Sequence, residues 1–410
     1  MDVRLNKKIK VSSEYDVVVA GGGMAGFCAA VAASRQGAKT LIIEHFAILG
    51  GLGSSGGVGN FDGRLEGAGN IFDEVVAKMR ALDAMEKTGS KFDHNVLPIV
   101  LQKIALDSKV KLLFHTDCVE VIRKKKTITH LIVFNRSGFS AIKAKVIIDA
   151  TGEGVVSQFA GAEILDKDKI KELIPPSMMF FMRDIGKTCL QKQISSKYIY
   201  KTKDDIPMLT PWWEPDGKVG IKFKIIGHDT GSGEGLSNAE IEAREKVLPL
   251  VKYFQENYKP TYKFDYTASI LGIREGRRIK GEYVLKGTDL FAGKKFEDVI
   301  AVGTFQTDAG DPKTDKRVYI KGGATKVPPY HIPFRSLKVK DLDNLLVAGR
   351  CLSADRIAMS SARVMATASM IGHSAGAAAA LAIRTKKKLR ELNIEKLQNM
   401  LTKDKMDLLL

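Results

Sequence analysis

A strand, a glycine-rich turn and a helix follow one another near the N-terminus, and this unit constrains the fold more than any other feature. Residues 15–20, Tyr-Asp-Val-Val-Val-Ala, contain the unbroken valine run of a buried parallel strand. Gly-Gly-Gly-Met-Ala-Gly follows at residues 21–26, and a second apolar strand is expected at residues 40–44. The pattern predicts a βαβ unit with a helix from about Met24 to Gln36, and therefore an α/β protein.

The three spaced glycines have separate tasks in a turn that binds a dinucleotide. Gly21 permits the tight turn, Gly23 lets a pyrophosphate approach the backbone, and Gly26 allows the helix to pack closely on the strand. The helix would direct its first N–H groups and the positive end of its dipole at that anion. Glu44 follows Gly23 by 21 residues, where a carboxylate accepts ribose hydroxyls. This acid favours an adenine dinucleotide over a glycine-rich turn of another kind.

Small residues recur at three later places and indicate a long, buried ligand. They lie at 49–59 (LGGLGSSGGVG), 146–152 (VIIDATG) and 344–349 (NLLVAG). The last two read as buried strands that end in small-residue turns. Three sites of close approach exceed what a nicotinamide cofactor bound to one half-domain would need.

With these stretches the chain resembles the FAD-dependent oxidoreductases with glutathione-reductase-type flavin binding. The matching stretches are Tyr15–Gly51, Ala144–Ala162, Pro176–Phe181, Leu271–Leu285, Phe296–Asp308 and Tyr330–Ala382. The resemblance implies FAD as the cofactor and an α/β, glutathione-reductase-type, Rossmann-like FAD-binding domain in two pieces. Between the pieces it implies an inserted substrate domain of mixed, mainly antiparallel α+β structure.

The rhythm of the expected elements sets the boundaries of these parts. Residues 1–165 are the first part of the FAD-binding domain, 166–335 the substrate domain, 336–385 the second FAD-binding part, and 386–410 a basic linker with a C-terminal helix. Expected elements include helices near 71–87, 96–107 and 238–256, an antiparallel meander within 117–148, and strands near 177–182 and 218–226.

The fingerprint and the resemblance together predict which residues contact FAD. They are Gly21, Gly23, Met24, Ala25, Gly26, Glu44, His45, Gly51, Ser55, Val119, Ala150, Thr151, Gly152, Gly349, Ala362, Arg363 and Val364. Val119 is included because the resemblance implies that this backbone meets the adenine. Covalent attachment of the flavin through His45 or a cysteine is an open alternative.

The resemblance also implies a helix that begins near Ser360 and points its N-terminus at the pyrimidine edge of the flavin. Reduction gathers negative charge at that edge, and oriented N–H groups stabilise it. Arg363 could add a full positive charge. Its alternative role is a salt bridge to the dinucleotide phosphates or to a surface acid.

Arginines in the segment 274–278 (REGRR) are candidates for binding a substrate. Arg274 and Arg278, four residues apart, would share one face if the segment is helical, and guanidinium groups suit carboxylates. Together with Arg350 and with His331, which can transfer protons near neutral pH, they form the predicted catalytic set. The alternatives are an internal salt-bridge network for the arginines and a structural hydrogen-bonding role for His331.

Two stretches depart from the family pattern. Relatives often carry Asp-x-His where this chain has Asp308-Ala-Gly310, and Thr-His where it has Asp355-Arg356. If those histidines move protons in relatives, then His331, Asp308 or Tyr330 takes a shifted role here, or the substrate differs. Cys351 matches the family and is interpreted as a packing thiol near the flavin.

The cysteines and histidines argue against disulfide and metal chemistry. Cys28, Cys118, Cys189 and Cys351 have no C-x-x-C spacing, which favours free thiols in a cytoplasmic protein. The seven histidines form no ligand cluster, so no metal is predicted. No secretory signal is visible, and the apolar stretch 375–383 is expected to be a buried helix rather than a membrane span.

The chain has 64 basic and 47 acidic residues, a net charge of +17, which favours anionic partners. The lysines lie in scattered runs without interleaved aromatic residues, as on an ordinary solvated surface. Nucleic acid is therefore not an expected partner, although a tRNA-modifying flavoprotein stays as an alternative.

After residue 60 no second strand–glycine–helix unit appears, so no dedicated NAD(P)H domain is predicted. Electrons would come from the organic substrate or from an external carrier. We expect an FAD-dependent oxidoreductase that transfers a hydride between FAD and a small organic molecule, with an anion favoured by the arginines. Besides a tRNA-modifying flavoprotein, a flavin-binding subunit of a multi-protein redox complex is an alternative. The substrate and the oligomeric state stay open.

Overall fold

A seven-stranded sheet forms the centre of the computed structural model, which describes residues 6–166, 173–192, 196–207, 209–213, 217–311 and 325–410. The strand order is β3-β2-β1-β6-β5-β4, and β13 also pairs with β6. The strands are β1 (Val11–Ala20), β2 (Thr40–Ile43), β3 (Lys111–Leu113), β4 (Asp117–Lys124), β5 (Thr127–Asn135), β6 (Gly138–Asp149) and β13 (Leu345–Val347).

The sheet is mixed, with a parallel part and an antiparallel part that share β6. β1 pairs in parallel with β2 and β6, and the parallel part continues to β3 on one side and β13 on the other. β4 and β5 form the expected meander on the amino half of β6. Val17, Val18 and Val19 of β1 are fully buried, as the valine run predicted. The predicted α/β class is confirmed.

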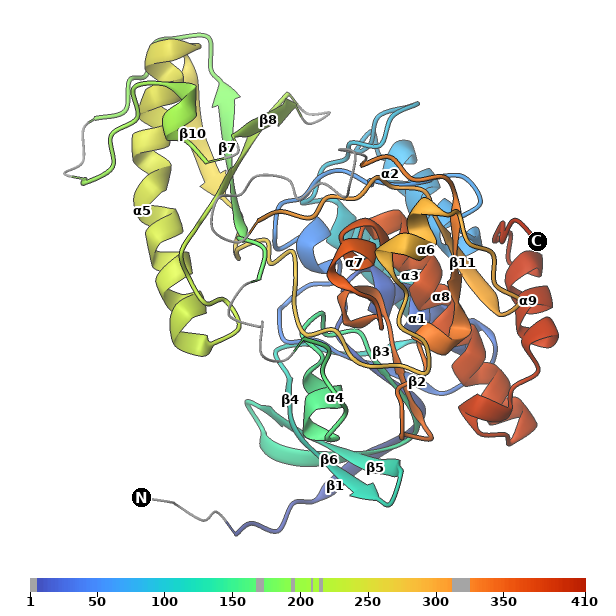
Figure 1. Cartoon of the computed structure of the whole chain (residues 1–410). Helices are drawn as coiled ribbons and strands as arrows, with labels where there is room; N and C mark the ends of the chain where they lie inside the picture. Colours follow the sequence, from blue (N-terminus) through green and yellow to red (C-terminus); the bar gives the residue numbers. More distant parts are fainter. Residues whose placement is uncertain (1–5, 167–172, 193–195, 208, 214–216, 312–324) are drawn as a thin grey trace.

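Two parallel helices pack on this sheet and are in direct contact with each other. They are α1 (Met24–Arg35) and α8 (Met365–Thr385), drawn side by side in Figure 1. A Cβ on Gly372 would overlap the carbonyl oxygen of Ala25, and a Cβ on Gly376 would overlap that of Ala29. Because the residue numbers rise together along both helices, α1 and α8 run in the same direction.

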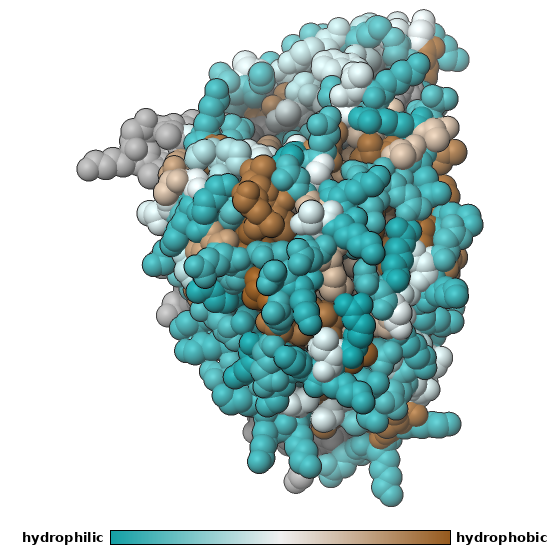
Figure 2. All heavy atoms as spheres, turned by 90° about the vertical axis from the view of Figure 1, so that its right-hand side faces the viewer, coloured by the Kyte–Doolittle hydropathy of each residue, from teal (hydrophilic) through white to brown (hydrophobic). Residues whose placement is uncertain are grey.

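Among the described residues, α8 is the one helix long and apolar enough to cross a membrane by length and composition. Its apolar window is 94% buried inside the protein, against α1, β11 (Val299–Gly303) and α9 (Ile394–Lys403). The expected buried helix at 375–383 is thus part of the longer α8. Hydrophilic residues cover most of the face that carries α9, with apolar residues in small groups (Figure 2).

A second, four-stranded antiparallel sheet lies apart from this core, at the upper left in Figure 1. Its order is β10-β7-β9-β8, with β7 (Ser177–Asp184), β8 (Thr210–Trp213), β9 (Val219–Lys224) and β10 (Tyr262–Thr267). The long helix α5 (Gly233–Asn257) packs on one face of this sheet. The expected strands at 177–182 and 218–226 and the helix at 238–256 are therefore present.

The remaining helices of at least five residues and the remaining strands lie outside the two sheets. They are α2 (Asn70–Ala81), α3 (Leu97–Asp107), α4 (Val155–Phe159), α6 (Gly287–Phe291), α7 (Arg356–Ala362), and the antiparallel pair β11 (Val299–Gly303) and β12 (Tyr330–Pro333). The helix expected at 71–87 is shorter than predicted, because the chain turns at Asp83, whose φ is 52°.

Candidate active site

The glycine turn between β1 and α1 has the strain and crowding that its sequence predicted. Gly21 has a φ of 97°, and a Cβ there would overlap the carbonyl oxygen of Ala150 in the turn after β6. A Cβ on Gly26 would overlap the carbonyl oxygen of Gly21. Both positions therefore need glycine for reasons internal to the protein.

Gly23 differs, because the described chain leaves room beside it. A Cβ on Gly23 would have only the Cα of Gly51 nearby, at 4.0 Å among the described residues. Gly23 is the N-cap of α1, which has no side-chain cap from the described chain and no acidic residue in its first turn. The first N–H groups of α1 thus have the character of an anion site, and the residues present fit the pyrophosphate of a dinucleotide.

Glu44 is held beside this turn at the end of β2. Its carboxylate accepts hydrogen bonds from the amides of Gly22, at 2.5 Å, and Phe46, at 2.7 Å. Burial raises the pKa of Glu44, and these two amide bonds oppose that shift. The next residue, His45, is exposed and pairs with Asp117 at the start of β4, two residues before Val119.

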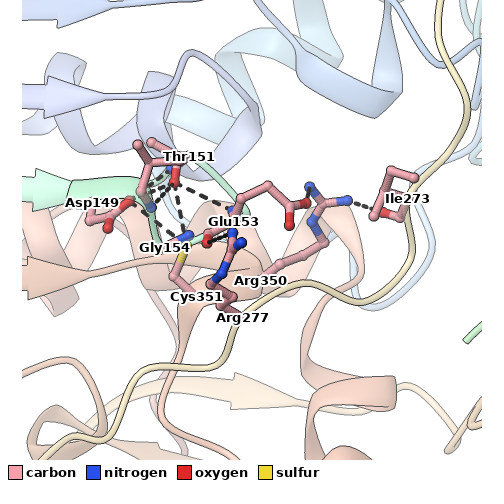
Figure 3. A network of polar contacts seen from close by, with 9 residues as sticks. Asp149, Thr151, Glu153, Gly154, Ile273, Arg277, Arg350 and Cys351 are labelled. Carbon is pink, nitrogen blue, oxygen red and sulfur yellow. Dashed lines mark hydrogen bonds and ion pairs between the residues drawn. The ribbon is translucent and has the colours of Figure 1, made fainter. Parts of the chain in front are cut away.

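The turn after β6 is built around the buried Asp149, as Figure 3 shows. One carboxylate oxygen accepts from the amide and hydroxyl of Thr151, at 3.2 and 2.7 Å, and the other from the amide and hydroxyl of Ser157, at 2.8 and 2.7 Å. These bonds hold Ala150 and Thr151 against Gly21 of the glycine turn. Cys351 accepts from the Gly154 amide at 3.2 Å, and burial raises its thiol pKa well above the ordinary value, as for a packing thiol.

We expect Asp149→Ala to lower the free energy of unfolding by about 3 kcal/mol, because it leaves several buried donors without an acceptor. Chemical denaturation measures this change. Asp107→Ala at the exposed end of α3, where the side chain only pairs with Lys103, is the matched control and should cost less than about 1 kcal/mol. Equal effects of the two changes would contradict the role assigned to Asp149.

Arg350 lies against this turn. It donates to the carbonyl oxygen of Ile273 and pairs with Glu153 at 3.2 Å (Figure 3). A Cβ on Gly152 would overlap the guanidinium group, which explains the glycine with its φ of 78°. Arg350 thus ties the end of β13 to the turn after β6 and to the segment that contains Arg274.

Arg274 and Arg278 do not share a helical face, because the condition for it, a helical segment, is not met. Residues 274–278 lie outside any helix, and a Cβ on Gly276 would overlap the carbonyl oxygen of Gly152. Arg278 donates to Ala354 O at 3.1 Å and pairs with Asp166 at 2.8 Å, the arrangement of an internal salt bridge. The two arginines therefore have separate surroundings.

Arg274 instead meets Arg363 at one carboxylate. Both guanidinium groups pair with Oδ2 of Asp308, Arg363 at 3.0 Å. Nη1 of Arg274 and Nε of Arg363 are buried without a hydrogen-bond partner among the described residues. Burial, reinforced by the charge of Arg274, lowers the pKa of Arg363 to about 10. Two guanidinium groups whose side chains are only 10% and 13% exposed thus share one carboxylate and keep donors to spare.

Two lysines that the sequence analysis missed join this cluster from β9. Lys222 and Lys224 interact electrostatically with Arg274, Arg363 and Asp308. They alternate with the apolar Ile221 and Phe223, which pack toward α5, so both lysines lie on the opposite face of the sheet. This alternation of lysine with apolar residues was the available signal. We call Lys222, Lys224, Arg274, Asp308 and Arg363 the cationic cluster.

His331 lies elsewhere. Its Nδ1 accepts from the Phe296 amide at 3.1 Å, and its Nε2 contacts Lys295 Nζ at 3.0 Å. The preceding residue, Tyr330, contacts the hydroxyl of Ser361 at 2.7 Å, and successive side chains of a strand point to opposite faces. Burial and the charge of Lys295 lower the pKa of His331. The structure therefore does not bring His331 to the cationic cluster, contrary to the set predicted from the sequence.

The helix expected to begin near Ser360 begins later. Ser360 and Ala362 belong to the short α7, Arg363 follows it, and Val364 is the N-cap of the long α8. Asp355 caps α7 through the Ala358 amide at 2.8 Å. Arg363 and Val364 still stand at the N-terminus of a long helix, while Ser360 accepts from the Asp308 amide at 3.0 Å.

The described residues contain no group of three or more His, Cys, Asp or Glu side chains that could hold a metal ion. A hollow of about 360 Å³ lies between the start of α3 and β10, next to the glycine-rich stretch 49–59. It is lined by Ser54, Ser55, His94, Asn95, Gln102 and Tyr266, among others. None of the cationic cluster lines it.

Comparison with known proteins agrees with this geometry. Residues 16–401 match the family described as FAD dependent oxidoreductase. A solved structure similar in fold is a geranylgeranyl bacteriochlorophyll reductase-like protein from Thermoplasma acidophilum, with a TM-score of 0.52, 16% identity, and coverage of 95% of this chain and 84% of that chain.

Two curated relatives match shorter segments. The thiamine thiazole synthase of Methanococcus vannielii is 30% identical over 158 residues, which cover 36% of this chain and 60% of the relative. That of Methanococcus maripaludis is 28% identical over 148 residues, which cover 34% and 56%. The matches thus span less than two thirds of either relative. The family match covers nearly all of the present sequence, and it confirms the predicted resemblance, the cofactor FAD and the enzymatic nature of the protein. This chain belongs to the FAD-dependent oxidoreductase family.

Proposed function

We propose that this FAD-dependent enzyme transfers a hydride between FAD and a small organic anion that binds at Arg274 and Arg363. No NAD(P)H domain takes part in this proposal. When bound, FAD supplies the hydride acceptor or donor. The protein binds and orients the substrate and tunes the electronic properties of the flavin. The observation that carries the proposal is the convergence of two buried guanidinium groups on one carboxylate, with donors to spare.

The starts of helices α1 and α8 are suited to hold the pyrophosphate and the isoalloxazine ring of FAD, respectively. Met24 starts α1 one residue before Ala25, whereas Met365 starts α8 seven residues before Gly372, which packs against Ala25. At about 1.5 Å per residue, α8 starts about 9 Å farther out along the shared direction. The start of α1 would hold the pyrophosphate, and the start of α8 with Arg363 would stabilise negative charge on the reduced ring.

The same arrangement supports the finer fold assignment. A glutathione-reductase-type FAD-binding domain made of residues 1–165 and 336–385 would contain β1, α1, β6, β13 and α8. Residues 166–335 would then be the substrate domain, and its sheet would present Lys222 and Lys224 to the site. Residues 386–410, with α9, would follow as a separate tail. The cytoplasmic location inferred from the cysteines stays a prediction.

The charges favour an anionic substrate. Lys222, Arg274 and Arg363 act on Asp308 as cations, with Asp62 as a further acid near Lys222. A buried excess of positive charge is costly without a counter-ion, and guanidinium groups bind carboxylates through paired hydrogen bonds. A small carboxylate would supply the missing charge and use the spare donors of Arg274 and Arg363.

Arg274→Lys tests this proposal, because it keeps the charge but loses the planar fork. We expect reduction of the bound flavin by a panel of small hydroxy and amino acids, followed at 450 nm, to slow by about 10- to 100-fold, the worth of a charged hydrogen bond. Sulfate, whose binding can be followed by the flavin spectrum, should bind correspondingly more weakly. FAD should stay bound.

Arg335→Lys is the matched control, since Arg335 also makes a forked pair, with Asp298, away from the cationic cluster. It should leave both readouts unchanged. If Arg274→Lys releases FAD or unfolds the protein, the arginine is a structural brace. Unchanged reduction and sulfate binding would remove it from the substrate site.

The alternatives have less support. The two thiazole synthase matches cover about a third of this chain, so the proposal does not take over their reaction. A tRNA-modifying role rests on net charge alone. A flavin-binding subunit of a larger complex, or an external electron carrier, is compatible with the proposal but has no specific feature in the described structure.

A further inference from the structure

One face of the second sheet packs on α5 and forms a hydrophobic core. The other face carries the two lysines of the cationic cluster. Val219, Ile221 and Phe223 of β9 pack with α5, so Lys222 and Lys224 project from the other face. On β7, Ser177 stands opposite Lys224 in the ladder. A backbone hydrogen bond joins this region to the glycine-rich stretch 49–59, because the Ser269 amide donates to Ser55 O at 3.0 Å.

Lys224 is the most enclosed lysine of this face, with 1% of its surface exposed. Four charged groups act on it, from its own strand, from the segment after β10, from the chain after β11 and from the end of α7. They are Lys222, Arg274, Asp308 and Arg363. The hydroxyl of Ser177 across the ladder is buried without a partner among the described residues. A cationic amine is therefore crowded by other cations and has a polar neighbour ready to donate or accept.

Burial, followed by repulsion from Arg274, lowers the pKa of Lys224 to about 7, although Asp308 acts in the opposite direction. Above that pH the amine is neutral and can take a proton. A group with a pKa near the working pH is the most effective general base. Lysines reach such values when they are buried beside other cations.

We propose that Lys224 Nζ is a catalytic proton acceptor for the oxidation of a small carboxylate that bears a hydroxyl or amino group on the reacting carbon. The inference rests on the proposed function, since Arg274 and Arg363 hold the carboxylate. Lys224 belongs to the same cluster and comes to it from β9, on the sheet face away from α5. A substrate held by its carboxylate would thus have its other polar group directed toward β9.

The substrate carbon would lose its hydrogen together with the bonding electron pair, that is, as a hydride. When bound, FAD would be the oxidant that accepts this hydride. The O–H or N–H bond on that carbon breaks, and its proton passes to the neutral amine of Lys224. The electron pair left behind forms the C=O or C=N bond. The substrate would lose two electrons to the oxidant that FAD supplies when bound, and Lys224 would become an ammonium group.

Competitive acetylation tests the protonation behaviour without turnover. The FAD-loaded protein is treated with trace acetic anhydride between pH 5.5 and 9.5, and labelling of each lysine is measured by peptide mass spectrometry. Labelling of Lys224 should reach half its maximum near pH 7. Lys145, whose pKa its partner Asp16 raises above the usual value, is the internal reference and should still be rising at pH 9.5.

A Lys224 profile that follows Lys145 would overturn the inference. No labelling at any pH would do the same, because a proton acceptor for a diffusing substrate has to be reached by small molecules.

Lys224→Met should lower flavin reduction at pH 8 by about 100-fold, in the range for a lost general base, while FAD remains bound. In the unchanged protein the reduction rate should rise with pH through about 7, because the pKa is lowered and the neutral amine prevails above it. The variant should lose this rise. An unaltered rise in Lys224→Met would contradict the role.

Sulfate binding separates this inference from the proposed function. If sulfate binds in Arg274-dependent fashion but Lys224 labels like Lys145, the anion site stands and the proton acceptor falls. If Arg274→Lys leaves sulfate binding and flavin reduction unchanged, the proposed function fails whatever the labelling of Lys224.

Discussion

Gly23→Val should give a folded protein that is colourless and does not take up FAD. A Cβ at Gly23 meets only Gly51 Cα, at 4.0 Å among the described residues, so the chain itself tolerates a side chain here. The valine methyl groups would occupy the space over the start of α1 where the pyrophosphate has to approach the backbone. Circular dichroism would report the fold, and absorbance at 450 nm after reconstitution would report the cofactor.

Gly23→Ala is the graded control, because it adds a single methyl group. It should keep the fold and weaken FAD binding less than valine does. If Gly23→Val protein were yellow and released FAD on denaturation, the pyrophosphate would not lie at this turn. If it were unfolded, Gly23 would have a structural role like that of Gly21.

Gly372→Val should prevent the protein from folding. The first side-chain carbon would overlap the backbone oxygen of Ala25, and neither α1 nor α8 can move without opening the core. We expect the free energy of unfolding to fall by more than about 4 kcal/mol, the range reached only when a core contact is destroyed. Thermal unfolding and yield of soluble protein measure the effect.

Gly233→Val is the matched control, because Gly233 starts α5 and a Cβ there meets no described atom within 4 Å. It should change stability by about 1 kcal/mol or less. A stable Gly372→Val protein would show that α1 and α8 are not in the close contact described. The offset between the two helix starts, which was derived from that contact, would then be wrong.

The cofactor half of the structure could be predicted from local sequence because its requirements are local. The glycines of the first turn, the valine run of β1 and Glu44 lie within one βαβ unit, and β1, α1 and β2 appear where the sequence placed them. The start of β1 was missed. Residues 11–14 are exposed or half-buried, and they form a strand because β6, more than a hundred residues later, pairs with them.

The substrate half was less predictable, since its geometry comes from contacts between distant segments. Whether residues 274–278 are helical was left open by the sequence; they are not, because Gly276 lies against Gly152 and the chain there follows the turn after β6. His331 was expected in the site because histidine suits proton transfer, yet its strand points it toward Lys295. Lys224 had no local signal beyond alternation in β9, because its pKa is lowered by burial and then by charged neighbours, most of them from other segments of the chain.

The most direct test of the account is a crystal structure of the FAD-loaded protein soaked in bromide, with the halide located by anomalous scattering. The account predicts the flavin ring beside Val364 at the start of α8 and a bromide ion bound to Arg274 and Arg363, near Lys224. A flavin ring away from α8, or bromide only on the outer surface with the two arginines still closed on Asp308, would contradict it.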